Sequence, residues 1–193
     1  RERIGRVAKS RAVQSRTRRR HAVRTVALVG YTNAGKSTLF NRLTGARTVA
    51  VDQLFATLDT TLRKVHVPGG QPVVLSATVG FIRDLPHDLV AAFRATLAEA
   101  AEADLIAHVV DGSAPERELK EAAVEEVLAA IGAADVPRIT IVNKIDLTGI
   151  APGIERDACG TITTVRLSAA SGVGCDALVA ALAERFPDRA SAM

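Results

Sequence analysis

Short apolar runs alternate with segments of helical periodicity along most of the chain. The apolar runs end at glycine or polar residues, which is typical of buried strands that lead into loops. Between them, apolar side chains recur every three or four residues, which indicates amphipathic helices. The pattern predicts strands at residues 25–29, 62–67, 72–77, 105–110, 138–142 and 165–167, and helices at residues 36–43, 88–103, 115–131 and 175–186.

The order of these elements predicts the fold class. Residues 62–67 and 72–77 flank Gly69 and Gly70 and are expected to pair as a hairpin. The other strands are separated by helices, which favours parallel pairing. We therefore expect an α/β fold with a doubly wound, mostly parallel sheet of about six strands, one antiparallel edge strand and flanking helices. Residues 46–60 lack clear periodicity and are predicted to form a loop.

Charge is distributed unevenly along the 193 residues. The net charge is +4, yet residues 1–24 contain ten Lys or Arg residues and only one acid, so the remainder is net acidic. Residues 1–24 are expected to be a basic helical arm, the end of an N-terminal domain that is absent here, and residues 25–193 a single domain. The arm is either a patch drawn to phosphate backbones or simply a solvated helix, and the sequence leaves both interpretations open.

Two features of the composition bear on location. No apolar run approaches the roughly 20 residues needed to span a bilayer, so no membrane insertion is expected. The two cysteines, Cys159 and Cys175, have no neighbouring Cys or His at metal-ligand spacing, so neither a disulfide framework nor a zinc site is favoured. These features predict a cytoplasmic protein.

A phosphate-binding loop follows the first predicted strand. The pattern Gly-x-x-x-x-Gly-Lys-Ser lies between an apolar strand and a helix, which is the context that supports it. Its glycines let successive N–H groups face an anion, and the helix adds its positive end. Lys36 should reach the β- and γ-phosphates, and the hydroxyl of Ser37 should ligate Mg²⁺. The predicted nucleotide-binding residues here are Gly30, Tyr31, Thr32, Asn33, Ala34, Gly35, Lys36, Ser37 and Thr38. They indicate a P-loop NTPase.

A second motif indicates which base is bound. Asn143, Lys144 and Asp146 follow a predicted strand and resemble the guanine-recognition motif of Ras-like and translation-factor GTPases. A carboxylate can accept hydrogen bonds from N1–H and the exocyclic amine of guanine, which adenine does not offer. Lys144 would cover the base and Asn143 would brace the phosphate loop. A further segment, Ser168, Ala169 and Ala170, resembles the loop that closes over the base through backbone N–H groups.

Three longer stretches carry a family resemblance. Residues 30–41, 52–59 (DQLFATLD) and 78–87 (TVGFIRDLPH) together resemble the HflX family of ribosome-associated GTPases, and the likeness extends over residues 25 to about 187. The resemblance implies a G domain that hydrolyses GTP to GDP with Mg²⁺. It assigns Thr57 to switch I, where it would contact Mg²⁺ and the γ-phosphate, and Gly80 to switch II, where its N–H would meet the γ-phosphate. Lys36, Thr57 and Gly80 are thus the expected catalytic residues, and Ser37 and Thr57 the metal ligands.

Two positions limit the expected hydrolysis. Ala77 stands where the family has an Asp that holds Mg²⁺ through a water, and losing such an anchor costs roughly 10- to 100-fold in metal affinity or activity. Phe81 stands where many GTPases place a glutamine that orients the attacking water. Arg83 and His87 are nearby and either assist or are ordinary surface residues. The intrinsic rate is therefore expected to be low.

Three functional hypotheses follow. The first is a GTP-hydrolysing switch that associates, as a monomer, with the 50S ribosomal subunit or its RNA and splits or rescues ribosomes under stress, as the resemblance implies. The second is a guanine-nucleotide-binding module whose hydrolysis is impaired by Ala77. The third is a nucleic-acid-binding arm, residues 1–24, on an incidental fold. His108, within an apolar run, is interpreted as a core histidine and not as a catalytic base.

Overall fold

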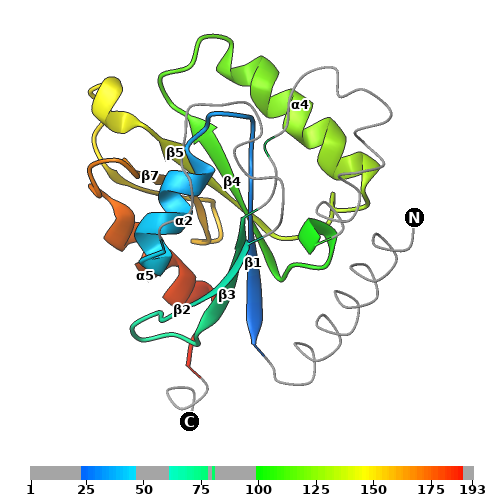
Figure 1. The fold of residues 1–193 in the computed structure, drawn as a ribbon, viewed down its shortest axis with the longest axis vertical. Coiled ribbons are helices and arrows are strands. Elements are labelled where there is room, and N and C mark those ends of the chain that lie inside the picture. Colours follow the sequence, from blue (N-terminus) through cyan, green and yellow to red (C-terminus); the bar gives the residue numbers. More distant parts are fainter. Residues whose placement is uncertain (1–22, 47–60, 78–79, 81–98, 189–193) are drawn as a thin grey trace.

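The computed structural model describes residues 23–46, 61–77, 80 and 99–188. The elements in these ranges (Figure 1) are β1 (Arg24–Val29), α2 (Lys36–Thr44), β2 (Thr61–Val65), β3 (Val73–Ala77), β4 (Leu105–Asp111), α4 (Arg117–Ala130), β5 (Arg138–Asn143), the short 3-10 helix η1 (Ile145–Leu147), β6 (Gly153–Arg156), β7 (Ile162–Arg166) and α5 (Cys175–Arg185). The expected loop at 47–60, most of the basic arm and most of the helix expected at 88–103 lie outside the described residues.

The strands form one sheet in the order β2-β3-β1-β4-β5-β7-β6. The central pairs are parallel, whereas β2 and β6 pair antiparallel with β3 and β7 at the two edges. This confirms the predicted α/β class, with a seventh strand and a second antiparallel edge added. The added strand, β6, has four residues, three of them exposed, so no apolar run marked it in the sequence.

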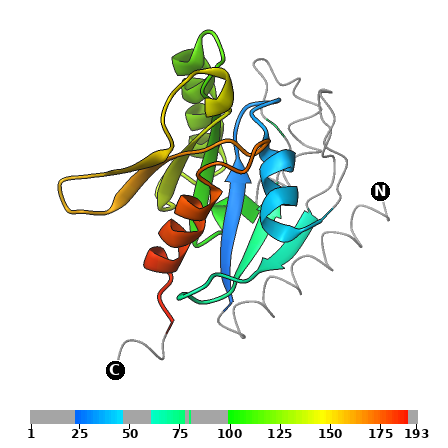
Figure 2. The same cartoon turned by 90° about the vertical axis from the view of Figure 1, so that its left-hand side faces the viewer.

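Helices cover both faces of the sheet because the side chains of each strand alternate between them. From β1, Val26 and Leu28 join the cluster that also contains residues of α2 and α5. Ala27 and Val29 join the second cluster, which contains Val124 of α4. Figure 1 shows the result, with α2 and α5 to the left of β1 and α4 to its upper right, and in Figure 2 α2 and α5 face the viewer while α4 lies behind.

The parallel pairing brings several loops to one edge of the sheet. Strands β1, β3, β4, β5 and β7 run in the same direction, so the segments that follow them start from a common edge. These segments include the phosphate-binding loop, Gly80, the residues that follow Asn143 at the end of β5, and the stretch at 168–170. In open α/β sheets, ligands bind at this carboxyl edge. Within the described part of the chain, no helix has the length and apolar character required to cross a bilayer.

Candidate nucleotide-binding site

The loop between β1 and α2 depends on three residues with positive φ. Gly30 and Gly35 have φ values of 150° and 92°, and Asn33 has 60°. A Cβ on Gly30 would lie 2.2 Å from the carbonyl oxygen of Val109, and one on Gly35 would lie 2.2 Å from Nδ2 of Asn143. The two glycines are therefore required both by backbone conformation and by close packing. They allow the loop to curl against the ends of β4 and β5.

The first turn of α2 has the features of an anion-binding site. Gly35 is its N-cap in the left-handed conformation, no side chain caps the helix, and no acidic residue lies in its first turn. Backbone N–H groups at a helix start need acceptors, and the helix dipole favours negative charge there. Ser37 and Thr38 lie half-buried in this turn. The local structure thus suits a phosphate group.

Lys36 points its ammonium group into the loop itself. Its side chain is only 7% exposed, and Nζ donates to the carbonyl oxygens of Gly30 at 3.0 Å and Tyr31 at 2.8 Å. Burial lowers the pKa of Lys36 to about 7, because the charged form loses water. An anion bound in the loop would reverse this effect by stabilising the ammonium group.

Asn143 joins the two halves of the site. It ends β5 and is 2% exposed. Its Nδ2 donates to the carbonyl oxygen of Ala34 at 2.8 Å, and its Oδ1 accepts from the N–H of Ala169 at 2.8 Å. One buried amide therefore links the phosphate-binding loop to the segment at 168–170. This is the bracing contact expected of Asn143 from the sequence.

The other two residues of the guanine motif differ in their surroundings. Lys144 has φ 63°, and its Nζ pairs with Oδ2 of Asp111 at 2.8 Å. Hydrogen bonds from Lys144 and Ser113 outweigh desolvation and lower the pKa of Asp111. Asp146 lies in η1 and is exposed, with no hydrogen bond or ion pair from any other described residue. Its carboxylate is accessible to a ligand.

Asp111 was not singled out by the sequence analysis. The available signal was its position directly after the apolar run of β4, at the edge where the other loops meet. It also accepts from the N–H and the hydroxyl of Ser113 at 2.9 and 2.7 Å. These contacts hold the carboxylate toward Lys144 and so fix the direction of that side chain.

The segment Ser168–Ala169–Ala170 is held by its neighbours on several sides. Ser168 is fully buried, and its hydroxyl accepts from the N–H of Ser171 at 3.1 Å. Arg42, in the last turn of α2, donates from Nε to the carbonyl oxygen of Ala169 at 3.0 Å and from Nη2 to that of Ala170. Sequence reasoning missed Arg42, because nothing in a helical pattern indicates a contact 127 residues away.

The switch residues are only partly described. Gly80 lies against the phosphate-binding loop, where an added Cβ would be 2.9 Å from Cα of Thr32 and 3.0 Å from Nζ of Lys36. Ala77 ends β3 opposite Leu28 of β1 and is 3% exposed within the core. Thr57, together with Phe81, Arg83 and His87, lies outside the described residues.

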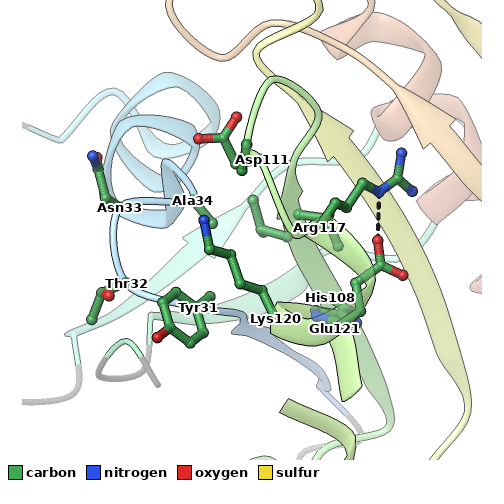
Figure 3. Close-up of a pocket in the computed structure, with 12 residues that line it drawn as sticks. Tyr31, Thr32, Asn33, Ala34, His108, Asp111, Arg117, Lys120 and Glu121 are labelled. Carbon is green, nitrogen blue, oxygen red and sulfur yellow. Dashed lines mark hydrogen bonds and ion pairs between the residues drawn. The ribbon is translucent and has the colours of Figure 1, made fainter. Parts of the chain in front are cut away.

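A small pocket flanks the phosphate-binding loop on the side of α4 (Figure 3). It encloses about 110 Å³ between the loop, β4 and α4. Ligand pockets usually measure roughly 300–1,000 Å³, so this one is too small for a nucleotide. Lys120 of α4 reaches over it, with Nζ 5.8 Å from the centre of the Tyr31 ring. The pocket therefore adjoins the phosphate-binding loop but is not the candidate nucleotide-binding site.

His108 lies at the floor of this pocket. It is 4% exposed, and its Nδ1 is 4.0 Å from Oε1 of Glu125. Burial lowers the pKa of His108, although Glu125 and Glu121 oppose the effect. A neutral, buried imidazole agrees with its interpretation as a core histidine.

Comparison with known proteins agrees with the geometry of the site. The family model described as 50S ribosome-binding GTPase matches residues 25–144. GTPase HflX of Caldanaerobacter subterraneus subsp. tengcongensis is 48% identical over 182 residues, which are 94% of this chain and 41% of that protein. GTPase HflX of Escherichia coli is 50% identical over 185 residues, which are 95% of this chain and 43% of that protein. The chain thus spans about two fifths of the length of these curated relatives.

A solved structure shows the same fold. The crystal structure of a GTP-binding protein from the hyperthermophilic archaeon Sulfolobus solfataricus in complex with GDP matches with a TM-score of 0.65 and 25% identity, covering 90% of this chain and 56% of that chain. The family likeness inferred from the three motif stretches is confirmed by the sequence relatives. The chain belongs to the 50S ribosome-binding GTPase family and is a homologue of GTPase HflX.

Proposed function

We propose that this chain binds GTP and GDP through the residues described above and hydrolyses GTP as a molecular switch. The observation that carries the proposal is the buried amide of Asn143, which connects Ala34 of the phosphate-binding loop to Ala169 by two hydrogen bonds of 2.8 Å. A purine nucleotide that bridges these two loops would hold its phosphates at α2 and its base between Asp146 and residues 168–170.

The chemistry of hydrolysis would be mainly positioning and charge stabilisation. Lys36 would move its ammonium group from the carbonyl oxygens of Gly30 and Tyr31 to the β- and γ-phosphates. Gly80, packed on Thr32, would offer its N–H to the γ-phosphate, and Thr57 would complete the catalytic set. With Phe81 in place of a water-orienting glutamine, the intrinsic rate would be low.

The described residues fit Mg²⁺ in part. Among them, Ser37 in the first turn of α2 would supply a hydroxyl ligand. Thr57, which lies outside the described residues, is proposed as a second hydroxyl ligand from the family resemblance alone. The end of β3 offers only the methyl group of Ala77, buried beside β1. Mg²⁺ commonly keeps several waters and takes further ligands from substrate phosphates. When bound, it would neutralise charge on the phosphates, and we propose that the nucleotide carries most of its coordination.

A second candidate function rests on the same position. Ala77 cannot anchor a metal-bound water, so the chain would bind guanine nucleotides while hydrolysing GTP poorly. Its burial within the apolar cluster supports this alternative, because the side chain at this position of β3 is a methyl group without a polar atom. The two candidates share the binding site and differ only in the rate of hydrolysis.

We further propose the large ribosomal subunit or its RNA as the partner, with ribosome splitting or rescue under stress as the outcome. The family description names 50S ribosome binding, and the HflX relatives share about half of their residues with this chain over the matched length. The basic residues at 1–24 would add salt-dependent attraction to phosphate backbones. We propose a cytoplasmic monomer.

Calorimetric titration with GDP, GTP and ADP, with and without Mg²⁺, tests this function. We expect tight binding of guanine nucleotides and at least about 100-fold weaker binding of ADP. Asp146→Asn should reduce this preference, because the amide cannot accept both hydrogen bonds from N1–H and the exocyclic amine. Equal binding of GDP and ADP by the unaltered chain and by Asp146→Asn would refute the proposed function.

A further inference from the structure

Arg42 is an exposed residue of α2 that makes two contacts with the segment at 168–170. Its Nε and Nη2 donate to the carbonyl oxygens of Ala169 and Ala170. Figure 2 shows how the segment after β7 passes close to α2, the helix that begins at the phosphate-binding loop. The same helix therefore contacts both ends of the proposed nucleotide site, with Lys36 in its first turn and Arg42 in its last.

The hydrogen bonds of the loop leave one N–H group available. The N–H of Ser168 donates to the carbonyl oxygen of Val173, and that of Ala169 donates to Oδ1 of Asn143. The N–H groups of Ser171 and Gly172 both donate to Ser168, to its hydroxyl and its carbonyl oxygen respectively. In the range 168–172, only the N–H of Ala170 has no acceptor among the described residues, and Ala170 is exposed.

Arg42 determines where this N–H points. In a trans peptide, the carbonyl group of one residue and the N–H of the next lie in one plane and point in opposite directions. When Arg42 holds the carbonyl of Ala169, the N–H of Ala170 must point away from α2. The second contact, to the carbonyl of Ala170, fixes the following peptide in the same way. Together they remove the rotation that would turn the N–H of Ala170 aside.

The sequence leaves room for this guanidinium group at Gly172. That residue has φ 91°, and a Cβ there would lie 3.0 Å from Nη1 and 3.3 Å from Cζ of Arg42. Asn143 holds the N–H of Ala169 while Arg42 holds its carbonyl oxygen. Ala169 is thus fixed on both sides, by one residue that also contacts the phosphate-binding loop and one on the helix that follows it.

We propose that Arg42 is a positioning residue for guanine recognition, orienting the N–H of Ala170 toward the O6 atom of the base. The inference rests on the proposed function, because it assumes that the base lies at residues 168–170. It adds a determinant of specificity outside the guanine motif. In this arrangement Arg42 would touch neither the base nor the phosphates and would act only through the backbone of the loop.

The test compares GDP with 6-thioguanosine diphosphate, in which sulfur, a weaker acceptor, replaces O6. The unaltered chain should bind GDP more tightly. Arg42→Ala should weaken GDP binding by about tenfold, the effect of losing charge-assisted hydrogen bonds that order a loop, and should leave binding of the thio analogue nearly unchanged. The ratio of the two dissociation constants should therefore approach one. Arg42→Lys, which keeps the charge without the planar fork, should give an intermediate ratio.

Arg185→Ala is the matched control, because Arg185 is the basic residue in the last turn of α5. It should leave both dissociation constants unchanged. If Arg42 only stabilised the C-terminus of α2, Arg42→Ala would lower the melting temperature and would weaken the binding of GDP and of its thio analogue equally. That result would overturn the inference. Equal binding of GDP and its thio analogue by the unaltered chain would also overturn it. Failure of the unaltered chain to prefer GDP over ADP would instead refute the proposed function.

Discussion

The low pKa of Lys36 predicts that nucleotide binding is coupled to proton uptake. Without a ligand the pKa is about 7, since the side chain is buried and its ammonium group, among the described residues, donates hydrogen bonds to the carbonyl oxygens of Gly30 and Tyr31. At pH 8 only about 10% of the molecules would carry the proton. A bound diphosphate should raise the pKa of Lys36 well above 8, because the phosphate charge stabilises the ammonium group, so each GDP should bring about 0.9 proton with it.

Apparent affinity should follow the same equilibrium. Binding requires the protonated form, so raising the pH from 7 to 9 should weaken GDP binding by about 50-fold, whereas binding between pH 5.5 and 6.5 should change little through Lys36. The assay is calorimetry at pH 8 in buffers with different ionisation enthalpies, whose slope counts the protons. Lys64 is an exposed residue of β2 and supplies the control variant Lys64→Met, which should take up as many protons on binding GDP as the unaltered chain. Lys36→Met should bind weakly and without proton uptake. A slope near zero for the unaltered chain would refute the assignment of a low pKa to Lys36.

Three further predictions concern packing and the switch. Asn143→Ala should lower the free energy of unfolding by about 2–5 kcal/mol in urea denaturation, because the carbonyl of Ala34 and the N–H of Ala169 lose their partner. A loss below about 0.5 kcal/mol would contradict the bracing role. Gly30→Ala should lower the free energy of unfolding by more than about 2 kcal/mol, because the added Cβ would overlap the backbone of β4. Gly45→Ala is the control for backbone strain alone, because Gly45 also has positive φ but an added Cβ there would have no atom within 4 Å. Ala77→Asp should speed single-turnover GTP hydrolysis by about 10- to 100-fold, with or without ribosomes; equal rates would remove the case for impairment.

Local patterns were enough for much of the fold and for the candidate site. Buried strands are continuous apolar runs, so β1, β4 and β5 could be located to within one residue, and the helices α2 and α5 likewise. The phosphate-binding loop is also a local structure, because its glycines and the helix that follows are adjacent in the chain. Strand β6 escaped prediction because its order comes from pairing with β7 and not from burial of its own side chains.

The sequence by itself determined which chemical groups are present: a Gly-Lys-Ser loop for phosphates, a carboxylate suited to guanine, and a methyl group where the family resemblance implies a metal anchor. The tertiary structure decided how these groups are held. The link from Asn143 to Ala34 spans 109 residues and that from Arg42 to Ala170 spans 128. Such contacts form only after the parallel strands bring their carboxyl ends to one edge, and no local periodicity records which side chains will meet there.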